Sequence, residues 1–303
     1  MKTLDLINME QNFFGERIPL PYKSMNLGEN FTLMLAGDEH IGNAGVDIDK
    51  MDKFVHSVKS KKKAFVVNMG DNLESISVKD PRYSILVHGC RASMIQEQRD
   101  AFIEQFNSIG DRFLTMMDGN HEMKFKNDFK PNSDIAKAFN TQYIDGTMCK
   151  LLFPGFRMLA WHGDGSIGGK AGDRLQRKTS EKVALKRKLR DLAADCEIKA
   201  MGHAHKLVLS EPSKEDLILM TDPNKMDLVA HYSQPGRINV GDGLYRIPED
   251  DVYYVCTGSF LKGYVEGIST YVEEKGYSPT ELGWVEIDVK NGKPCDIRLM
   301  KSM

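Results

Sequence analysis

Long apolar runs are missing from this sequence of 303 residues. No stretch of about 18 apolar residues, the length that crosses a bilayer, occurs in it, and residues 1–17 lack the shorter apolar run of a signal peptide. Cysteine is also sparse, since the five cysteines are scattered and no two of them form a C-x-x-C pair. This pattern argues against a disulfide framework and against a structural zinc–thiolate site. We therefore expect a cytoplasmic protein with no membrane partner.

A strong excess of charge is absent as well. Lys and Arg total 41 against 43 Asp and Glu, and the formal net charge of −2 argues against a surface that is basic all over, although it leaves room for a local basic patch. Hydrophobic residues make up 41% of the chain, enough for a sizeable core. No repeat or low-complexity linker marks a boundary, so we expect one domain over residues 1–303. Within it, residues 1–29 form an N-terminal extension, and residues 206–251 and 263–283 form insertions or capping segments.

Short apolar runs alternate with amphipathic stretches along the first two-thirds of the chain. Five runs have the length and composition of buried strands, and residues 46–58 and 94–109 each place apolar side chains on one helical face. This alternation predicts an α/β fold. The five predicted strands are Phe31–Ala36, Ala64–Met69, Phe113–Met117, Phe156–Trp161 and Glu197–Met201, and further strands are predicted over 252–257, 283–289 and 295–299 after a turn-rich stretch at 215–251.

Residues that can bind metal ions follow each of the five strands directly. Because ligands of α/β sheets bind beyond the carboxyl ends of the strands, we expect these residues to meet at one place. Glycines beside them allow the backbone to turn sharply there. The five segments are Gly37–His40, Gly70–Asn72, Asp118–Glu122, His162–Asp164 and Gly202–His205.

The donor types in these segments indicate transition metals. His203 and His205 are two residues apart, and in an extended segment residues at this spacing point to the same side. The donors that we select from these segments are two carboxylates, an amide oxygen and four or five imidazoles, a set that suits Mn, Fe, Zn or Ni better than Ca. These donors suffice for two ions that share a carboxylate, the arrangement that stabilises both the attacking and the leaving oxygen in phosphoryl displacement.

In order and approximate spacing, the motifs resemble those of the calcineurin-like metallophosphoesterase superfamily. The resemblance spans residues 37–205 and a later strand that ends in Thr257–Ser259, and the tail is similar to those of phage and mobile-element members. It implies a central two-sheet β-sandwich flanked by helices, with the metal site at the carboxyl ends of strands. The matching elements are D-x-H (Asp38, His40), G-D (Gly70, Asp71), G-N-H-[DE] (Gly119 to Glu122), a lone His162 and G-H-x-H (Gly202, His203, His205).

The resemblance also implies a role for each site residue. The first metal would be bound by Asp38, His40, Asp71 and His205, and the second by Asp71, Asn120, His162 and His203. Asp71 would bridge the ions, and a hydroxide between them would attack the phosphorus. His121 would neutralise or protonate the leaving oxygen, and Glu122 would orient the His121 side chain. We therefore expect two divalent ions per chain, manganese first, with iron, zinc or nickel as the alternatives.

A basic segment bears on the substrate, which the motifs leave open. Residues 170–190 contain nine Lys or Arg and two acidic residues, a net charge of +7, and begin eight residues after His162. One interpretation is a stripe that binds a polyanion beyond the scissile phosphate, through Lys170, Arg174, Arg177 and Lys178. The other is a solvated helix face whose apolar residues point partly inward.

The segment 263–283 also has two interpretations. It contains Tyr264, Tyr271 and Tyr277. These tyrosines would either cap the site as a surface on which bases stack or pack against the sheet, and we predict that they pack.

The sequence thus predicts a metal-dependent phosphodiesterase acting on DNA or RNA. A phosphomonoesterase acting on a nucleotide or phosphoprotein is the nearest alternative. A non-catalytic scaffold is the second alternative, and the presence of all seven ligand residues and of His121 argues against it. The sequence leaves the oligomeric state open.

Overall fold

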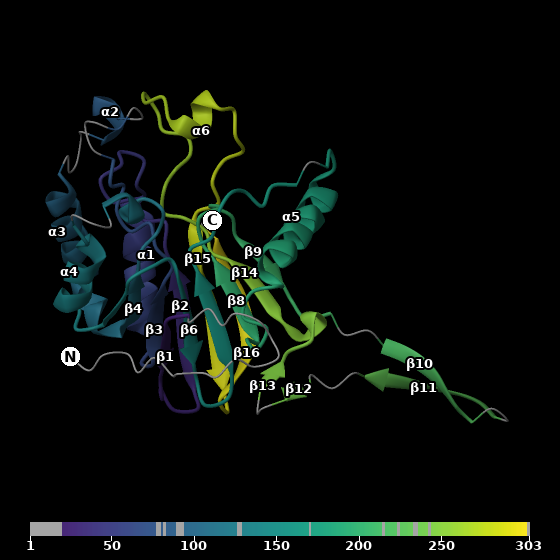
Figure 1. Cartoon of the computed structure of the whole chain (residues 1–303). Helices are drawn as coiled ribbons and strands as arrows, with labels where there is room; N and C mark the ends of the chain where they lie inside the picture. The colour runs from purple at the N-terminus through teal and green to yellow at the C-terminus, as the bar shows by residue number, and fades with distance from the viewer. Residues whose placement is uncertain are drawn as a thin grey trace.

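Two six-stranded sheets packed face to face form the centre of the protein, and helices cover both outer sides (Figure 1). This confirms the α/β class and the two-sheet β-sandwich flanked by helices that the resemblance implies. The computed structural model describes residues 20–76, 80, 83–88, 94–125, 129–169, 171–213, 216–222, 225–232, 236–241 and 244–301. Most of the predicted N-terminal extension, residues 1–19, lies outside these ranges.

One sheet contains the first three predicted strands, which run parallel to one another. The predictions for Phe31–Ala36 and Phe113–Met117 are confirmed to the residue, and the second strand ends one residue earlier than predicted. A parallel strand extends this sheet on one edge and an antiparallel pair on the other. In spatial order the strands are β16 (Lys293–Lys301), β15 (Gly283–Lys290), β2 (Phe31–Ala36), β3 (Ala64–Asn68), β4 (Phe113–Met117) and β5 (Gln142–Ile144).

The other sheet contains the fourth and fifth predicted strands. Its three central strands, β7, β8 and β14, are parallel, and both neighbours of this trio are antiparallel to it. In spatial order the strands are β1 (Tyr22–Ser24), β6 (Met148–Leu152), β7 (Arg157–Trp161), β8 (Ile198–Met201), β14 (Tyr253–Cys256) and β9 (Val208–Ser210).

Strand β2 shows how the residues divide between the two faces of a sheet. Leu33 and Leu35 point into the core between the sheets, whereas Met34 and Ala36 pack against the helices. Because both faces are buried, the strand is apolar throughout instead of alternating. The covering helices are α1 (Ile48–Ser60), α3 (Ile95–Phe106) and α4 (Pro131–Ala138) on this side, and α5 (Arg174–Leu189) on the outer face of the other sheet.

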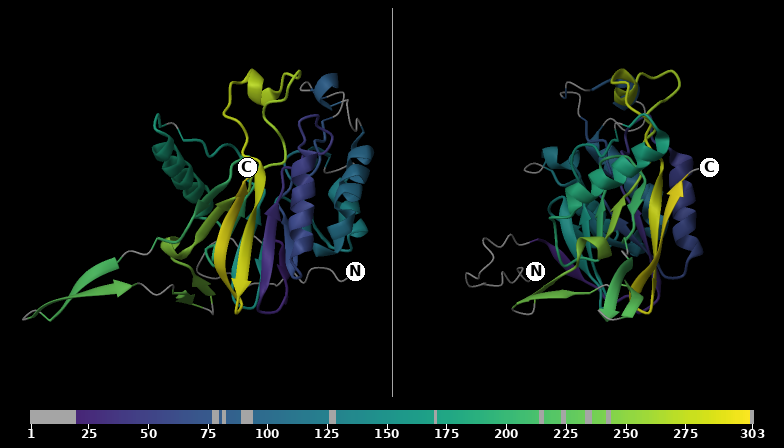
Figure 2. Two further views of the ribbon diagram at one scale, coloured as in Figure 1. Left: turned by 180° about the vertical axis from the view of Figure 1, so that it is seen from behind. Right: turned by 90° about the vertical axis from the view of Figure 1, so that its right-hand side faces the viewer.

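Several short elements surround this core. The stretch 215–251, expected to be mainly turns, forms two hairpins, and that of β10 and β11 projects away from the sandwich (Figure 2). None of the helices in the described part of the chain has the length and apolar character needed to cross a membrane. The remaining elements are α2 (Ile85–His88), η1 (Asn107–Arg112), η2 (Glu122–Phe125), β10 (Asp216–Asp222), β11 (Lys225–Tyr232), β12 (Ile238–Gly241), β13 (Leu244–Arg246), η3 (Glu249–Asp251) and α6 (Tyr271–Glu274).

Candidate metal centre

The loops that follow β2, β3, β4, β7 and β8 bring the seven predicted metal ligands together. Six of them form two groups whose donor atoms all lie within 4.8 Å of one another: Asp38 with His40 and His205, and Asp71 with His162 and His203. A third such group joins His40, Asp71 and His121, so it links the other two. The chain therefore carries candidate metal-binding groups where the strand ends predicted them.

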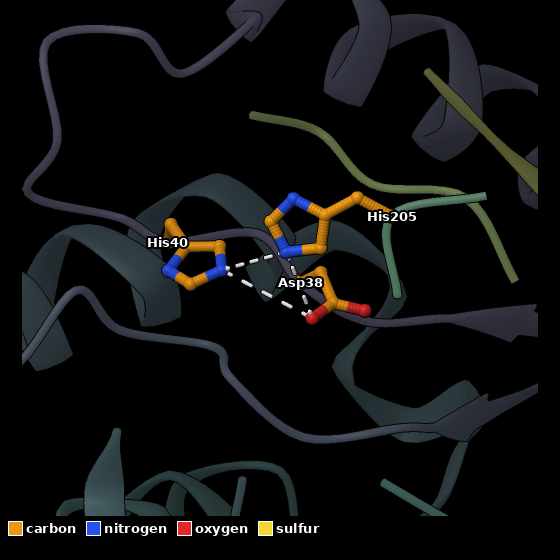
Figure 3. A group of neighbouring side chains, drawn as sticks. All are labelled: Asp38, His40 and His205. Carbon is orange, nitrogen blue, oxygen red and sulfur yellow. Dashed lines mark hydrogen bonds and ion pairs between the residues drawn. The ribbon is translucent and has the colours of Figure 1, made fainter. Parts of the chain in front are cut away.

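The first group centres on the carboxylate of Asp38 (Figure 3). Its Oδ1 lies 3.3 Å from Nε2 of His205 and 4.0 Å from Nε2 of His40. The two Nε2 atoms are 3.3 Å apart. Oδ2 of Asp38 accepts a hydrogen bond from the backbone N–H of His203, which ties the first group to the loop that supplies the second.

The second group centres on Asp71 and the buried ring of His162. Nε2 of His162 lies 3.3 Å from Oδ2 of Asp71 and 3.3 Å from Nδ1 of His203. Oδ1 of Asn120 is 3.0 Å from the same Nε2, so the predicted fourth ligand also reaches this position. Oδ2 of Asp71 is in addition 3.8 Å from Nε2 of His40, which places Asp71 between the two groups.

The backbone is strained at these residues. Nine non-glycine residues of the described chain have positive φ, and five of them are predicted ligands: Asp38, His40, Asp71, His203 and His205, with φ between 49° and 63°. Such conformations are costly for residues with a side chain and cluster at functional sites. Their concentration here shows that the fold holds these side chains in place against a local preference.

The hydrogen bonds of the buried His162 and His40 leave one ring nitrogen of each facing a carboxylate, where a cation fits. Nδ1 of His162 lies 2.8 Å from the carbonyl oxygen of Met69, which can only accept, so Nδ1 carries the proton. In a neutral ring the lone pair of Nε2 then faces Oδ2 of Asp71, an unfavourable pairing of two acceptors. His40 is arranged alike, because its Nδ1 donates to Glu74 at 3.0 Å and its Nε2 faces Asp38 and Asp71. A metal ion resolves both conflicts, so the residues fit one.

The pKa values of these rings indicate the same need for positive charge. Burial opposes protonation of His162, but the charge of Asp71 and its hydrogen bond raise the pKa to about 10. Burial also opposes protonation of His40, and Glu74 raises its pKa to about 9. The carboxylates thus attract a cation to these positions, either protons or metal ions.

His121 and Glu122, the two predicted catalytic residues, lie in different surroundings. The ring centroids of His121 and His40 are 4.7 Å apart, and Nδ1 of His121 donates to the carbonyl oxygen of Glu74 at 2.5 Å. Glu122 is buried and accepts the backbone N–H groups of Leu73 and Gly119 at 2.9 and 2.8 Å. Glu74, rather than Glu122, therefore positions the His121 ring, and Glu122 holds together two loops that carry ligands.

Glu74 and His88 are site residues that the sequence analysis missed. The carboxylate of Glu74 is shared between His40 and Nε2 of His88, which lies 3.3 Å away. A carboxylate that orients a metal-binding histidine is a recurrent feature of metal sites. Glu74 follows Asp71 by three residues, which was the one signal in the sequence, whereas nothing in the sequence places His88 of α2 beside it.

Gly119 leaves space for the shared carboxylate. A methyl group on its Cα would lie 2.0 Å from Oδ1 of Asp71 and 2.3 Å from the backbone nitrogen of Asp71. We expect Gly119→Ala to displace Asp71 and to lower the metal content at both positions, measured by elemental analysis of dialysed protein. Gly168→Ala is the matched control, because no described atom lies within 4 Å of its methyl group. Equal metal content in the two variants would contradict this prediction.

The predicted substrate contacts on α5 are less available than expected. Lys170 lies outside the described residues. The ammonium group of Lys178 lies 2.5 Å from Glu281 and 2.9 Å from Glu181, so two carboxylates neutralise it. Because Glu281 also accepts the backbone N–H of Leu207, this cluster connects α5 to the strand region beside it. Lys178 thus has a structural role in the described fold.

The other two cations of this set remain at the surface. The guanidinium group of Arg177 donates to the carbonyl oxygens of Ala171 and Gly172, within its own loop. Arg174 is exposed and makes no ion pair with any described residue. Neither residue lines the cavity at the metal-binding groups, so only a substrate that extends along the surface would reach them.

A cavity of about 650 Å³ opens above the metal-binding groups. His40, Asp71, Asn120, His121, His203 and His205 all face it. One wall comes from the α2 region with Ser84, Val87 and His88, and another from Leu261, Lys262 and the α6 region, with residues 269–272, 274 and 275. The prediction that the tyrosine-bearing segment 263–283 packs on the sheet is therefore wrong: part of it caps the site, and its three tyrosines are 45–59% exposed.

Comparisons with known proteins show similarity to solved structures only. No family model matches the sequence, and no curated protein matches it. Vps29 from Entamoeba histolytica, solved with zinc, shares 12% identity over 90% of this chain and 98% of its own, at a TM-score of 0.41. Vps29 from Chaetomium thermophilum shares 12% identity over 90% and 97%, at 0.36. A candidate 5′-nucleotidase from Staphylococcus aureus, solved with α-ketoglutarate, shares 12% over 90% of this chain and 54% of its own, at 0.41. At these scores the likeness assigns no residue roles.

Proposed function

We propose that this protein is a metal-dependent phosphoesterase that holds two divalent ions and hydrolyses phosphodiester bonds, with DNA or RNA as substrate. The observation that supports the proposal is the geometry of Asp71, whose carboxylate lies between two groups of donors from five strand ends. Two metal positions that share one carboxylate are the arrangement used for phosphoryl displacement.

The proposal assigns a set of residues to each ion. Asp38, His40, Asp71 and His205 would bind one ion, and Asp71, Asn120, His162 and His203 the other, with manganese first and iron, zinc or nickel as alternatives. When bound, the ions would supply Lewis-acid stabilisation of the phosphoryl oxygens and activation of water. The protein contributes the orientation: Glu74 fixes the ring of His40, and the Met69 carbonyl oxygen fixes that of His162.

His121 and the cavity walls have the other roles in the proposed reaction, which are proton exchange and the displacement of water. His121 faces the cavity while its Nδ1–H is held by the Glu74 carbonyl oxygen, so its Nε2 is free to exchange a proton with a bound group. A substrate bound between the wall from the α2 region and the wall from residues 261–262 and 269–275 would displace water from the cavity. Removal of water strengthens the electrostatic interactions at the phosphate.

The surface charge supports nucleic acid as the substrate. The exposed basic side of α5 starts close in sequence to His162, and Lys262 and Lys275 line the cavity itself. A phosphomonoesterase would need positive charge at the metal site alone. A cytoplasmic location is part of the proposal and rests on the scattered cysteines, of which Cys149, Cys196 and Cys256 are buried free thiols.

One assay separates the proposed activity from its alternatives. Purified protein is supplied in turn with Mn²⁺, Fe²⁺, Zn²⁺ and Ni²⁺ and offered bis-p-nitrophenyl phosphate, p-nitrophenyl phosphate and single-stranded and double-stranded DNA and RNA. We expect turnover of the diester and of at least one nucleic acid. Turnover of the monoester alone would favour a phosphomonoesterase, and no turnover of any substrate with any of the four metals would favour a non-catalytic scaffold.

The surface of α5 provides the test for nucleic acid. We expect Arg174→Glu combined with Arg177→Glu to weaken cleavage of DNA or RNA and to leave bis-p-nitrophenyl phosphate hydrolysis unchanged, because the small ester does not reach α5. Each lost phosphate contact should flatten the dependence of log affinity on log salt by about one unit. The matched control is Lys53→Glu with Lys59→Glu, which makes the same charge change on α1 behind the opposite sheet. Equal effects of the two double variants would contradict a specific role of α5.

A further inference from the structure

The segment 261–280 is built to hold α6 away from the sheets and over the metal centre. Figures 1 and 2 show α6 standing beyond the end of the sandwich, on the same side as α2. Hydrogen bonds at the base of the segment fix it there. The hydroxyl of Thr280 donates to the carbonyl oxygen of Leu261 at 2.7 Å and accepts the N–H of Gly263 at 3.0 Å. The hydroxyl of the buried Thr270 donates to the carbonyl oxygen of Gly263 and caps α6.

Tyr271 is the aromatic residue that the segment 261–280 presents to the cavity. Its side chain lines the cavity while remaining 59% exposed. The ring of Tyr277 meets it edge-on, with the centroids 6.0 Å apart, and the hydroxyl of Tyr264 donates to the Tyr277 carbonyl oxygen at 2.6 Å. An exposed aromatic ring that neighbouring side chains hold in place is a surface for another flat ring.

Two cations accompany this ring. The ammonium group of Lys275 lies 5.8 Å from the centroid of Tyr271, and Lys275 makes no ion pair with any described residue. Lys262 also lines the cavity, with its ammonium group 3.4 Å from Asp47. A flat aromatic surface, two ammonium groups and a metal-binding floor match the parts of a nucleotide, which are the base and the phosphates on either side of the sugar.

We infer that Tyr271 and Lys275 form a nucleoside subsite, in which a base adjacent to the scissile phosphate stacks on Tyr271 and Lys275 pairs with the next phosphate. This inference rests on the proposed function, since it takes the phosphate to lie at the metal centre. The cavity of about 650 Å³ is of the size that holds a small-molecule ligand, so it accommodates one or two nucleotides rather than a duplex. Because the cavity holds one or two nucleotides, the inferred substrate is single-stranded or an unpaired end.

The test compares a thymidine dinucleotide with an abasic dinucleotide. The abasic substrate is identical except that one of the two bases that flank the phosphate is missing. KM and kcat are measured with Mn²⁺ for the wild type, Tyr271→Ala, Tyr271→Phe and the control Tyr22→Ala, an exposed tyrosine of β1 outside the cavity. We expect Tyr271→Ala to raise KM for the complete dinucleotide about 5- to 100-fold, the range that corresponds to loss of base–aromatic stacking. Its KM for the abasic substrate, and all values for Tyr271→Phe and Tyr22→Ala, should match those of the wild type.

Three results would overturn the subsite. The first is an equal change of KM for the complete and the abasic dinucleotide in Tyr271→Ala. The second is a rise of KM in Tyr271→Phe as large as in Tyr271→Ala. The third is a rise of KM for a phosphopeptide, but not for the dinucleotide, in Tyr271→Ala. A second readout covers failure of the proposed function. If the wild type hydrolyses no phosphodiester, calorimetry with thymidine monophosphate decides: weaker binding by Tyr271→Ala than by Tyr22→Ala supports the subsite, and equal binding contradicts it.

Discussion

Asp71→Asn is expected to abolish turnover and to release metal from both positions. The substitution keeps the size of the side chain and one oxygen but removes the negative charge that both donor groups share. Oδ2 of Asp71 lies 3.3 Å from Nε2 of His162 and 3.8 Å from Nε2 of His40, so its charge acts on a histidine of each donor group. Loss of a shared ligand empties a two-metal site more completely than loss of a ligand to one ion.

Elemental analysis of dialysed protein and hydrolysis of bis-p-nitrophenyl phosphate measure this effect. The matched control is Asp164→Asn, because Asp164 lies two residues after His162 but is exposed and pairs with Lys188 at 2.7 Å. The control should keep two metal ions and full activity. Retention of two ions in Asp71→Asn would show that the shared position has been assigned to the wrong residue.

His121→Ala should behave differently, with both metal ions retained and the rate reduced by about 10²- to 10⁴-fold, the range of general acid–base catalysis. Burial lowers the pKa of His121 to about 4, so the ring is neutral at pH 7 in the metal-free protein and offers an unprotonated Nε2 to the cavity. A phosphate bound in front of it would raise that pKa and make proton exchange with the leaving oxygen favourable.

The distinction between a catalytic and a metal-binding role is measurable for His121. Its ring nitrogen also belongs to the group formed with His40 and Asp71, so a role as ligand has a geometric basis. Metal content and kcat are compared in His121→Ala and in His56→Ala, an exposed histidine of α1. If His121→Ala loses one metal ion per chain, the residue is a ligand and the proton-transfer role is withdrawn.

The location of the site was predictable because it depends on short-range features. Each ligand follows an apolar strand directly, and parallel strands place their carboxyl ends at one edge of a sheet. Asp38 and Asp71 could therefore be placed together from strand and loop patterns. Their assignment to separate metal positions came from the resemblance to a known superfamily, since spacing in the sequence does not say which side chains share an ion.

Contacts between distant segments account for what was missed. Lys178 was predicted to bind substrate, but Glu281, 103 residues away, is one of the carboxylates that neutralise it. The tyrosines of 263–283 were predicted to pack on the sheet, with a cap over the site as the alternative. Hydrogen bonds of Thr270 and Thr280 hold them off the sheet instead, and such bonds leave no periodic signal in the sequence.

The proposed function requires that two metal ions bind side by side and share Asp71. The most direct measurement is anomalous diffraction from crystals of the wild-type protein soaked in Mn²⁺. We predict two anomalous peaks about 3.5–4 Å apart, one among Asp38, His40 and His205 and the other among Asn120, His162 and His203, with Asp71 between them. A single peak, or peaks away from Asp71, would rule out a pair of ions that shares this carboxylate.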